Sequence, residues 1–339
     1  MRGVADFSIA GPVPGSLSYE ARVRLTGIRT RVEHAARRLL WGNRRRWERR
    51  PNVLPWLDRA NAGDRLQARP ADPLTPHLVQ WVRDGWFVLE DGVDPADIDA
   101  MSARLDGLWE ASTPIPNLTV LDLHEDHDEP VRDLSHAELL AVPAARRARM
   151  RDVSNWRIHG FHYFDPAARR LFHHPQLRQL ASALFGRRAR PFAAINFRRG
   201  SEQALHQDMA VFHIYPHNFL LGAWIACEDI SSESGPLVLH PGSHREPMFP
   251  GFTHYPQTNL RTASVTDSAA YQAYADALAQ RHPRHEFLAR KGQVLFWHGM
   301  LLHGGAPVLR PELTRKSMVL HYTVRGADCA REIDGPFNW

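Results

Sequence analysis

The sequence predicts a mainly β fold under a helical cover, with many short strands that form a sandwich or a barrel. Beyond Gly186 the apolar residues recur with a period of two, which is typical of strands. Glycine and proline turn signals separate these apolar stretches, for example at 234–236 and 303–305. Many short strands divided by such turns favour a sandwich or a barrel.

Residues 1–71 are predicted to form a basic, helical N-terminal extension. Within 18–50 the apolar residues recur at spacings of three and four, which suits one stripe of a helix. Residues 1–70 contain 15 Arg and 6 acidic residues. Such an arm could contact nucleic acid, anionic lipid or an acidic carrier protein, but a solvated or self-packing helix is the simpler interpretation. Because no nucleic-acid-binding module is recognisable, we do not expect a nucleic-acid partner.

Residues 72–339 are predicted to be one domain with two additions. An insertion is expected at about 113–150, where a Pro-rich loop, an acidic stretch and a short helix follow one another, and a lid segment at about 244–290. Asp94 before Pro95 predicts the start of a helix, because Asp caps helices and Pro suits their first turn. The expected helices cover 75–83, 95–109, 166–185 and 267–281; the expected strands cover 86–89, 191–198, 203–213, 219–227, 236–240, 293–297, 301–303 and 315–324.

The composition is that of a globular protein without a membrane span. Hydrophobic residues make up 43% and charged residues 23% of the chain, and the longest apolar run, 219–227, is too short to cross a bilayer. The two cysteines, Cys227 and Cys329, provide no disulfide framework. We expect a cytoplasmic protein, and its oligomeric state stays open.

The most informative motif is His206-Gln207-Asp208. On a strand, residues two apart point to the same face, so an imidazole and a carboxylate would project side by side. Alone this motif is weak, because short His–acid pairs occur by chance. His303, at the end of an apolar run and before two glycines, would add a second imidazole. Two His and one carboxylate leave open positions on a metal and suit non-haem Fe(II).

A second group of residues favours an organic-acid co-substrate. Arg315 and Ser317 lie two apart on a predicted strand and could together grip one carboxylate, as a 2-oxo acid chelated to the metal would require. His321 shares that face and could support the site. His298 lies five residues from His303 and should face away from it, which indicates a structural role.

Residues 72–323 resemble the phytanoyl-CoA dioxygenase family of Fe(II)/2-oxoglutarate oxygenases. The similarity rests on four motifs in the family's order, namely 81–89, 206–208, 222–230 together with 234–244, and 303–315. It implies a double-stranded β-helix (jelly-roll, cupin-like) core, with Fe(II) held by His206, Asp208 and His303 as the catalytic centre. It also implies 2-oxoglutarate at Arg315, with O₂ as the other co-substrate, and a co-substrate pocket lined by Trp224, with Ser317 as a less firm contact. Gly305 stands where some relatives have a hydroxyl residue.

Polar strand residues suggest further contacts around this site. The expected co-substrate contacts are Asn196 and Gln203; the expected substrate contacts are Arg198, Phe212, His213 and Tyr255. Their chemistry favours a small polar or carrier-bound substrate over a bare lipid.

The function expected from these residues is oxidation by an Fe(II)/2-oxoglutarate oxygenase, most simply a hydroxylation. The retained Asp208 argues against the halogenases of the superfamily, which lack this carboxylate. A desaturase, a cyclase or an epimerase on the same scaffold remains an alternative, because these enzymes share the oxidant. A non-catalytic cupin-like binding protein is the alternative of a different class, but such a protein has no need of His206, Asp208, His303 and Arg315 together.

Overall fold

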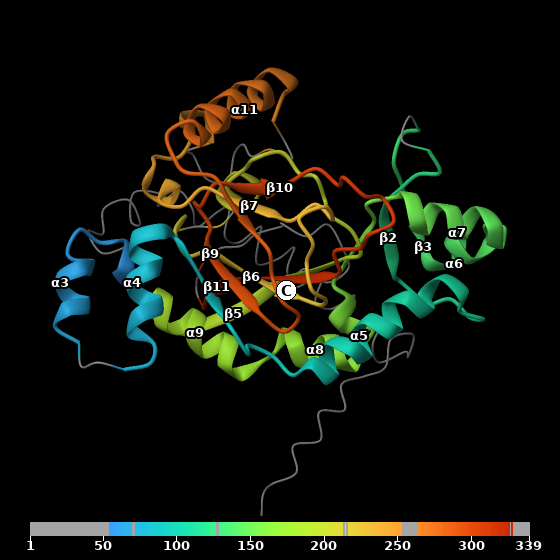
Figure 1. Ribbon diagram of the computed structural model, residues 1–339, viewed down its shortest axis with the longest axis horizontal. Helices are drawn as coiled ribbons and strands as arrows, with labels where there is room; N and C mark the ends of the chain where they lie inside the picture. Colours follow the sequence, from blue (N-terminus) through green and yellow to red (C-terminus); the bar gives the residue numbers. More distant parts are fainter. Residues whose placement is uncertain are drawn as a thin grey trace, which may run out of the picture. The chain divides into compact units, whose positions relative to one another are not determined.

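The computed structural model describes residues 54–69, 72–126, 129–212, 214, 216–252, 260, 263–325 and 327. Two antiparallel sheets form its centre (Figure 1). The large sheet has the order β1 (Trp86–Leu89), β9 (Val294–His298), β6 (Leu221–Ala226), β11 (Ser317–Val324), β5 (Ala189–Phe197), β4 (Arg157–His159), β2 (Thr119–Leu123) and β3 (Arg132–Ser135); the small sheet has the order β10 (His303–Gly305), β7 (Leu237–Leu239) and β8 (His285–Phe287). These two sheets confirm the predicted jelly-roll class.

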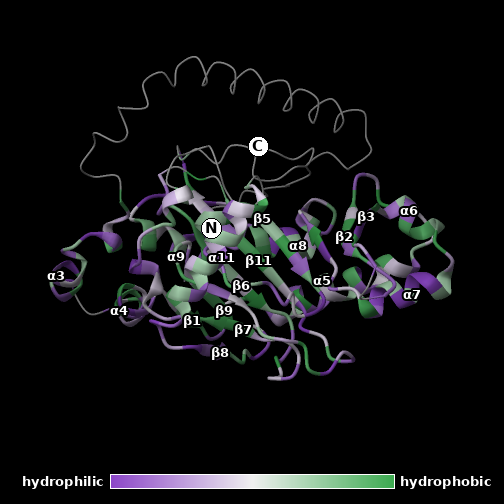
Figure 2. Ribbon diagram, turned by 90° about the horizontal axis from the view of Figure 1, so that it is seen from above, coloured by the Kyte–Doolittle hydropathy of each residue, from purple (hydrophilic) through white to green (hydrophobic). Residues whose placement is uncertain are grey.

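Strand alternation gives the large sheet two different faces. On β11, Leu320 and Tyr322 belong to the core shared with the helices, whereas Val319 belongs to a second core. That second core also includes Leu237 and Phe287 of the small sheet, so the two sheets pack face to face. In Figure 2 the central strands are coloured as hydrophobic, while α7 carries hydrophilic residues.

Helices cover the outer face of the large sheet. In Figure 1, α9, α8 and α5 lie along one side of it. The α-helices are α3 (Ala62–Gln67), α4 (Thr75–Asp84), α5 (Pro95–Gly107), α6 (His136–Ala141), α7 (Ala144–Val153), α8 (Pro166–Phe172), α9 (Pro175–Phe185), α10 (Asp208–Val211) and α11 (Val265–Ala279); the short 3-10 helices are η2 (Trp56–Asp58), η3 (Leu108–Glu110), η4 (Phe161–Tyr163), η5 (Ser243–Arg245) and η6 (Pro250–Phe252). None of the helices within the described residues is long and apolar enough to cross a bilayer.

Local signals explain the predicted helix ends. The side chain of Asp94 accepts a hydrogen bond from the backbone N–H of Ala96 at 2.8 Å, which confirms the N-cap of α5. Gly85 ends α4 in the left-handed conformation, at φ 81°.

Several predicted elements are wrong or incomplete, among them the strand at 301–303, which shares only His303 with β10. The helix at 166–185 is two helices, because Pro175 pushes His174 into an extended conformation between them. In place of the strand at 203–213, the chain forms a single β-bridge at His206 and then the helical turn α10. The backbone N–H of Phe212 donates to the carbonyl of Asp208 within this turn and not to a neighbouring strand. The insertion at 113–150 also holds the hairpin β2–β3, which extends the large sheet beyond β4.

The segment before α4 is fastened to the sheet by polar contacts. The Asp58 carboxylate accepts a hydrogen bond from Asn218 at 2.9 Å and lies 3.1 Å from Nε2 of the buried His298. Trp56 donates its indole N–H to the carbonyl of Ala183 at 2.7 Å. His298 therefore has the structural role that its position predicts. The helical extension predicted at 18–50, Cys329, His213 and Tyr255 lie outside the described residues.

Gly222 provides the space that a large indole needs at the centre of the sheet. It pairs with Trp297 of β9 on one side and with His321 of β11 on the other. A Cβ at Gly222 would lie 2.2 Å from Cε2 of Trp297, and therefore the indole could not keep its place beside any larger residue.

We expect Gly222→Ala to destabilise the protein by about 1–3 kcal/mol, because the indole must move within a packed core. The measurement is the free energy of unfolding in a denaturant titration. Gly63→Ala is the control, since the added Cβ on α3 meets nothing within 4 Å, and it should raise stability by about 0.5–1 kcal/mol. Equal stability of Gly222→Ala and the wild type would contradict the packing argument.

Candidate metal and co-substrate site

Backbone pairing brings two histidines together at one end of the sheets. The N–H of His206 donates to the carbonyl of His303 at 2.8 Å, and the N–H of His303 donates to the carbonyl of His206 at 2.9 Å. This isolated antiparallel bridge places both side chains on the same side, with ring centroids 4.5 Å apart.

Both imidazoles are oriented by carbonyl groups of their own segments. Nδ1 of His206 lies 2.8 Å from the carbonyl oxygen of Ala204, and Nδ1 of His303 lies 2.9 Å from that of Leu301. Because a carbonyl can only accept, each Nδ1 carries the proton, and each Nε2 presents its lone pair to the site. Burial and the neighbouring His206 lower the pKa of His303 to about 4, so this imidazole is neutral at neutral pH.

Asp208 completes a group that can hold a metal ion. Its Oδ1 lies 3.9 Å from Nε2 of His206 and 3.7 Å from Nε2 of His303, and the three ligand atoms all lie within 4.8 Å of one another. Burial alone would raise the pKa of Asp208, but the surrounding imidazoles, with His321 first among them, outweigh burial and keep this pKa well below its ordinary value. The set offers two neutral nitrogens and one carboxylate oxygen, which is the donor chemistry that Fe(II) sites use.

Gln207, between His206 and Asp208, ties this turn to α11. Its backbone N–H donates to the Tyr271 hydroxyl at 2.8 Å, and its side-chain amide donates to the carbonyl of Met300 at 2.9 Å. Tyr271 belongs to α11, which is the helix expected at 267–281. The buried side chain of Tyr271 in α11 therefore holds the backbone between His206 and Asp208.

The three ligand-type residues line one open cavity of about 640 Å³. Apolar side chains of the two sheets form most of its wall, and Arg315 lies in the same wall. The lining residues are Arg157, Ile195, Phe197, Ser201, Gln203, His206, Asp208, Val211, Phe212, Trp224, Leu237, Trp297, His303, Gly304, Arg315, Val319 and His321.

Arg315 is a buried cation that needs an anion. Its side chain is 1% exposed, and among the described residues Nε and Nη1 have no hydrogen-bond partner. Its guanidinium lies 5.8 Å from the ring centroid of Trp224, whose own indole N–H is also unpaired among these residues. Burial lowers the pKa of Arg315 to about 10, so the group is still charged at neutral pH. A carboxylate entering the cavity would satisfy these donors.

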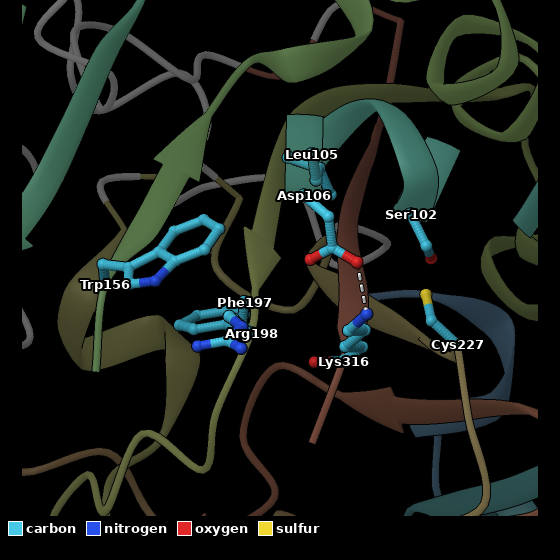
Figure 3. Close-up of a pocket in the computed structure, with 9 residues that line it drawn as sticks. Ser102, Leu105, Asp106, Trp156, Phe197, Arg198, Cys227 and Lys316 are labelled. Carbon is cyan, nitrogen blue, oxygen red and sulfur yellow. Dashed lines mark hydrogen bonds and ion pairs between the residues drawn. The ribbon is translucent and has the colours of Figure 1, made fainter. Parts of the chain in front are cut away.

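A second, smaller cavity of about 250 Å³ lies next to the first, and Phe197 lines both (Figure 3). Its charged groups are paired, since Lys316 lies 2.6 Å from Asp106 and Arg198 lies 2.8 Å from Asp152. Ser317, a predicted co-substrate contact, lines this second cavity and not the first, and its hydroxyl has no hydrogen-bond partner among the described residues.

Two further predicted contacts, Arg198 and Asn196, do not line the first cavity. Arg198 faces the second cavity and binds Asp152 and the carbonyl of Arg151, so it does not line the first. Asn196 lies between Ile195 and Phe197 on β5, and strand alternation therefore turns it to the helix-covered face, where its amide is 3.3 Å from the sulfur of Met101. Gln203, Phe212 and Trp224 do line the cavity, as expected.

Arg157 and Trp297 are two of the lining residues that the sequence reasoning missed. Arg157 belongs to β4, a three-residue strand with no periodic signal, and its Nε lies 2.9 Å from Asp122 of the insertion. Trp297 belongs to the strand predicted at 293–297. No sequence pattern linked this residue to Asp208.

Comparisons with known proteins agree with this site. The sequence profile described as phytanoyl-CoA dioxygenase (PhyH) matches residues 81–316. The chain is 26% identical over 260 residues to the phytanoyl-CoA dioxygenase domain-containing protein 1 of Danio rerio, covering 69% of this chain and 85% of that protein. It is 31% identical over 132 residues to the peroxisomal phytanoyl-CoA dioxygenase of Rattus norvegicus, covering 39% of this chain but only 36% of that enzyme.

A solved structure shares the fold. The 2-oxoglutarate-dependent epimerase SnoN from nogalamycin biosynthesis aligns with a TM-score of 0.52 and 20% identity, over 77% of this chain and 87% of that chain.

We expect His303→Ala to lose tight binding of one divalent metal ion, because the variant keeps only one imidazole and the carboxylate. Isothermal titration with Co(II) under anaerobic conditions measures the affinity. His285→Ala is the control, since His285 is an exposed residue of β8. Unchanged binding by His303→Ala would place the metal elsewhere.

We expect Arg315→Met to weaken 2-oxoglutarate binding about ten- to a hundredfold, because a hydrogen-bonded contact to a charged group contributes roughly 1.5–3 kcal/mol. Titration of 2-oxoglutarate into the metal-loaded protein measures this change. Arg198→Met is the matched control, because it removes an Arg that lines the neighbouring cavity and already has a partner. Equal weakening by both variants would argue against a specific anchor at Arg315.

Proposed function

The chain belongs to the phytanoyl-CoA dioxygenase family, and we propose that it hydroxylates a small molecule with O₂ and 2-oxoglutarate as co-substrates. The observation that carries this proposal is the combination, in one cavity, of the His206, Asp208 and His303 ligand atoms with the unpaired cation of Arg315. A metal ligand set alone suits many functions, but a buried guanidinium beside it selects an anionic co-substrate.

The chain's own residues can hold each part of this chemistry. Fe(II) fits Nε2 of His206, Oδ1 of Asp208 and Nε2 of His303, and Arg315 suits the carboxylate of 2-oxoglutarate that lies away from the metal. Iron with 2-oxoglutarate and O₂ supplies the oxidant for a C–H bond. Apolar side chains such as Leu237 and Val319 line the wall beside these groups and limit the access of water.

The remaining cavity wall suits a substrate with an apolar body and a polar group. Phe212 provides an apolar surface, while Gln203 and Ser201 offer hydrogen bonds. Arg157 is half-buried, and its Nε lies 2.9 Å from the Asp122 carboxylate. These groups support the proposal of a small polar or carrier-bound substrate. The rat relative is named a phytanoyl-CoA dioxygenase, and a CoA ester is an example of a carrier-bound molecule.

Other outcomes of the same oxidation remain alternatives to hydroxylation. SnoN is an epimerase on this fold, and desaturation or cyclisation would need no different ligand set. For the location, we propose the cytoplasm, with support from a sequence that contains only two cysteines. A non-catalytic binding protein is the alternative that the following experiment separates from all of these.

We expect the anaerobically purified protein with Fe(II) and 2-oxoglutarate to form succinate slowly after exposure to air, even without substrate. His206→Ala should abolish this turnover, because it removes one ligand. The measurement is succinate by chromatography. Failure of the wild type to bind either Fe(II) or 2-oxoglutarate would support the binding-protein alternative. Binding of both without turnover would mean that oxygen activation waits for the substrate.

A further inference from the structure

The two oxygens of Asp208 have different surroundings. Oδ1 faces the Nε2 atoms of His206 and His303 at 3.9 and 3.7 Å. Oδ2 accepts a hydrogen bond from the indole N–H of Trp297 at 2.7 Å and lies 3.4 Å from Nε2 of His321. One oxygen therefore faces the ligand set, and the other is engaged by two side chains of the large sheet.

The donors are fixed by their packing. Trp297 is 3% exposed, and its ring lies 5.1 Å from that of His303. His321 is also 3% exposed, and its ring lies 4.4 Å from that of Phe212. An indole has a single N–H, so the bond to Asp208 uses the whole donor capacity of Trp297. Nδ1 of His321 has no partner among the described residues, which leaves Nε2 free to carry the proton toward Oδ2.

The register of three strands makes this arrangement. Gly222 of β6 pairs with Trp297 of β9 and with His321 of β11, and it has no side chain to keep them apart. The two ring centroids lie 6.3 Å apart at 89°, and both side chains approach Asp208. Because the residues come from neighbouring strands rather than loops, the sheet itself sets the direction of both donors.

We propose that Trp297 and His321 are positioning residues that hold Asp208 as a one-oxygen metal ligand. The inference rests on the proposed function, since it concerns the metal that His206, Asp208 and His303 would hold. A carboxylate can bind a metal through one oxygen or through both. The hydrogen bond from Trp297 to Oδ2, together with Nε2 of His321 at 3.4 Å, would oppose the second contact. A metal held through Oδ1 alone would keep more room for 2-oxoglutarate or O₂. Hydrogen bonds to a metal-bound carboxylate also orient it before the metal arrives.

The test replaces the indole N–H while keeping an aromatic ring. Trp297→Phe should weaken Co(II) binding about ten- to a hundredfold, which is the usual effect of losing an outer hydrogen-bond partner of a metal ligand. The visible spectrum of the Co(II)-loaded protein should also change, because its intensity reports the coordination number. Trp86→Phe is the matched control: it removes an unpaired indole of β1, stacked on His285, and should change neither readout.

His321 provides a second, graded test. His321→Leu removes the donor and should weaken Co(II) binding, whereas His321→Gln keeps an N–H and should recover part of the affinity. The loss in Trp297→Phe/His321→Leu should be smaller than the two single losses combined, because both donors act on the same oxygen.

The outcomes separate this inference from the proposed function. The positioning role would be overturned if Trp297→Phe bound Co(II) with wild-type affinity and gave an unchanged spectrum. A cooperative thermal unfolding transition would show that this variant is folded. Equal losses in His321→Leu and His321→Gln would overturn the role of His321 as a donor. Absence of Co(II) binding by the wild type, or equal binding by His206→Ala, would instead overturn the ligand set itself.

Discussion

The pair of backbone hydrogen bonds between His206 and His303 is the constraint on which the site depends. It joins a single bridge residue to the short strand β10, and it places both imidazoles on one side of the chain. Each ring is then turned by a carbonyl two residues earlier in its own segment. The ligand geometry is therefore a property of the backbone, and only Asp208 depends on side chains from other strands for its orientation.

Two buried charges make the cavity costly to leave without ligands. Asp208 and Arg315 line the same cavity, are 3% and 1% exposed respectively, and do not pair with each other. Asp208 has Trp297 and three imidazoles around it, whereas two nitrogens of Arg315 have no partner among the described residues. An unpaired buried charge destabilises the folded state. An anion that pairs with this charge binds the folded state but not the unfolded state, and it therefore stabilises the fold. Recognition of the co-substrate and stabilisation of the fold are thus one interaction.

Much of this arrangement could be predicted from sequence, and the failures have physical causes. Period-two patterns with turn signals predicted β11, which begins two residues after Arg315, since buried strands alternate whatever their neighbours are. The same alternation misled at 203–213, where an apolar pattern also suits the turn α10. Asn196 was assigned by polarity, but its face follows from its strand neighbours. Arg157 and the hairpin β2–β3 were missed because their strands are short and polar, and sheet pairing rather than local preference forms them. Trp297 could not be linked to Asp208, 89 residues away, without the register of three strands.

The contacts of Asp58 and Trp56 bear on where an independently folding fragment begins. Leu57 and Leu66 lie in the same core as the helices on the outer face of the sheet, and Asp58 faces the buried His298 at the end of β9. Removal of this segment would leave the buried His298 without the carboxylate of Asp58, five residues before His303. A truncated gene intended for crystallisation or expression should therefore retain the codons from Leu54 onward, because a boundary at residue 71 would cut through the core rather than beside it.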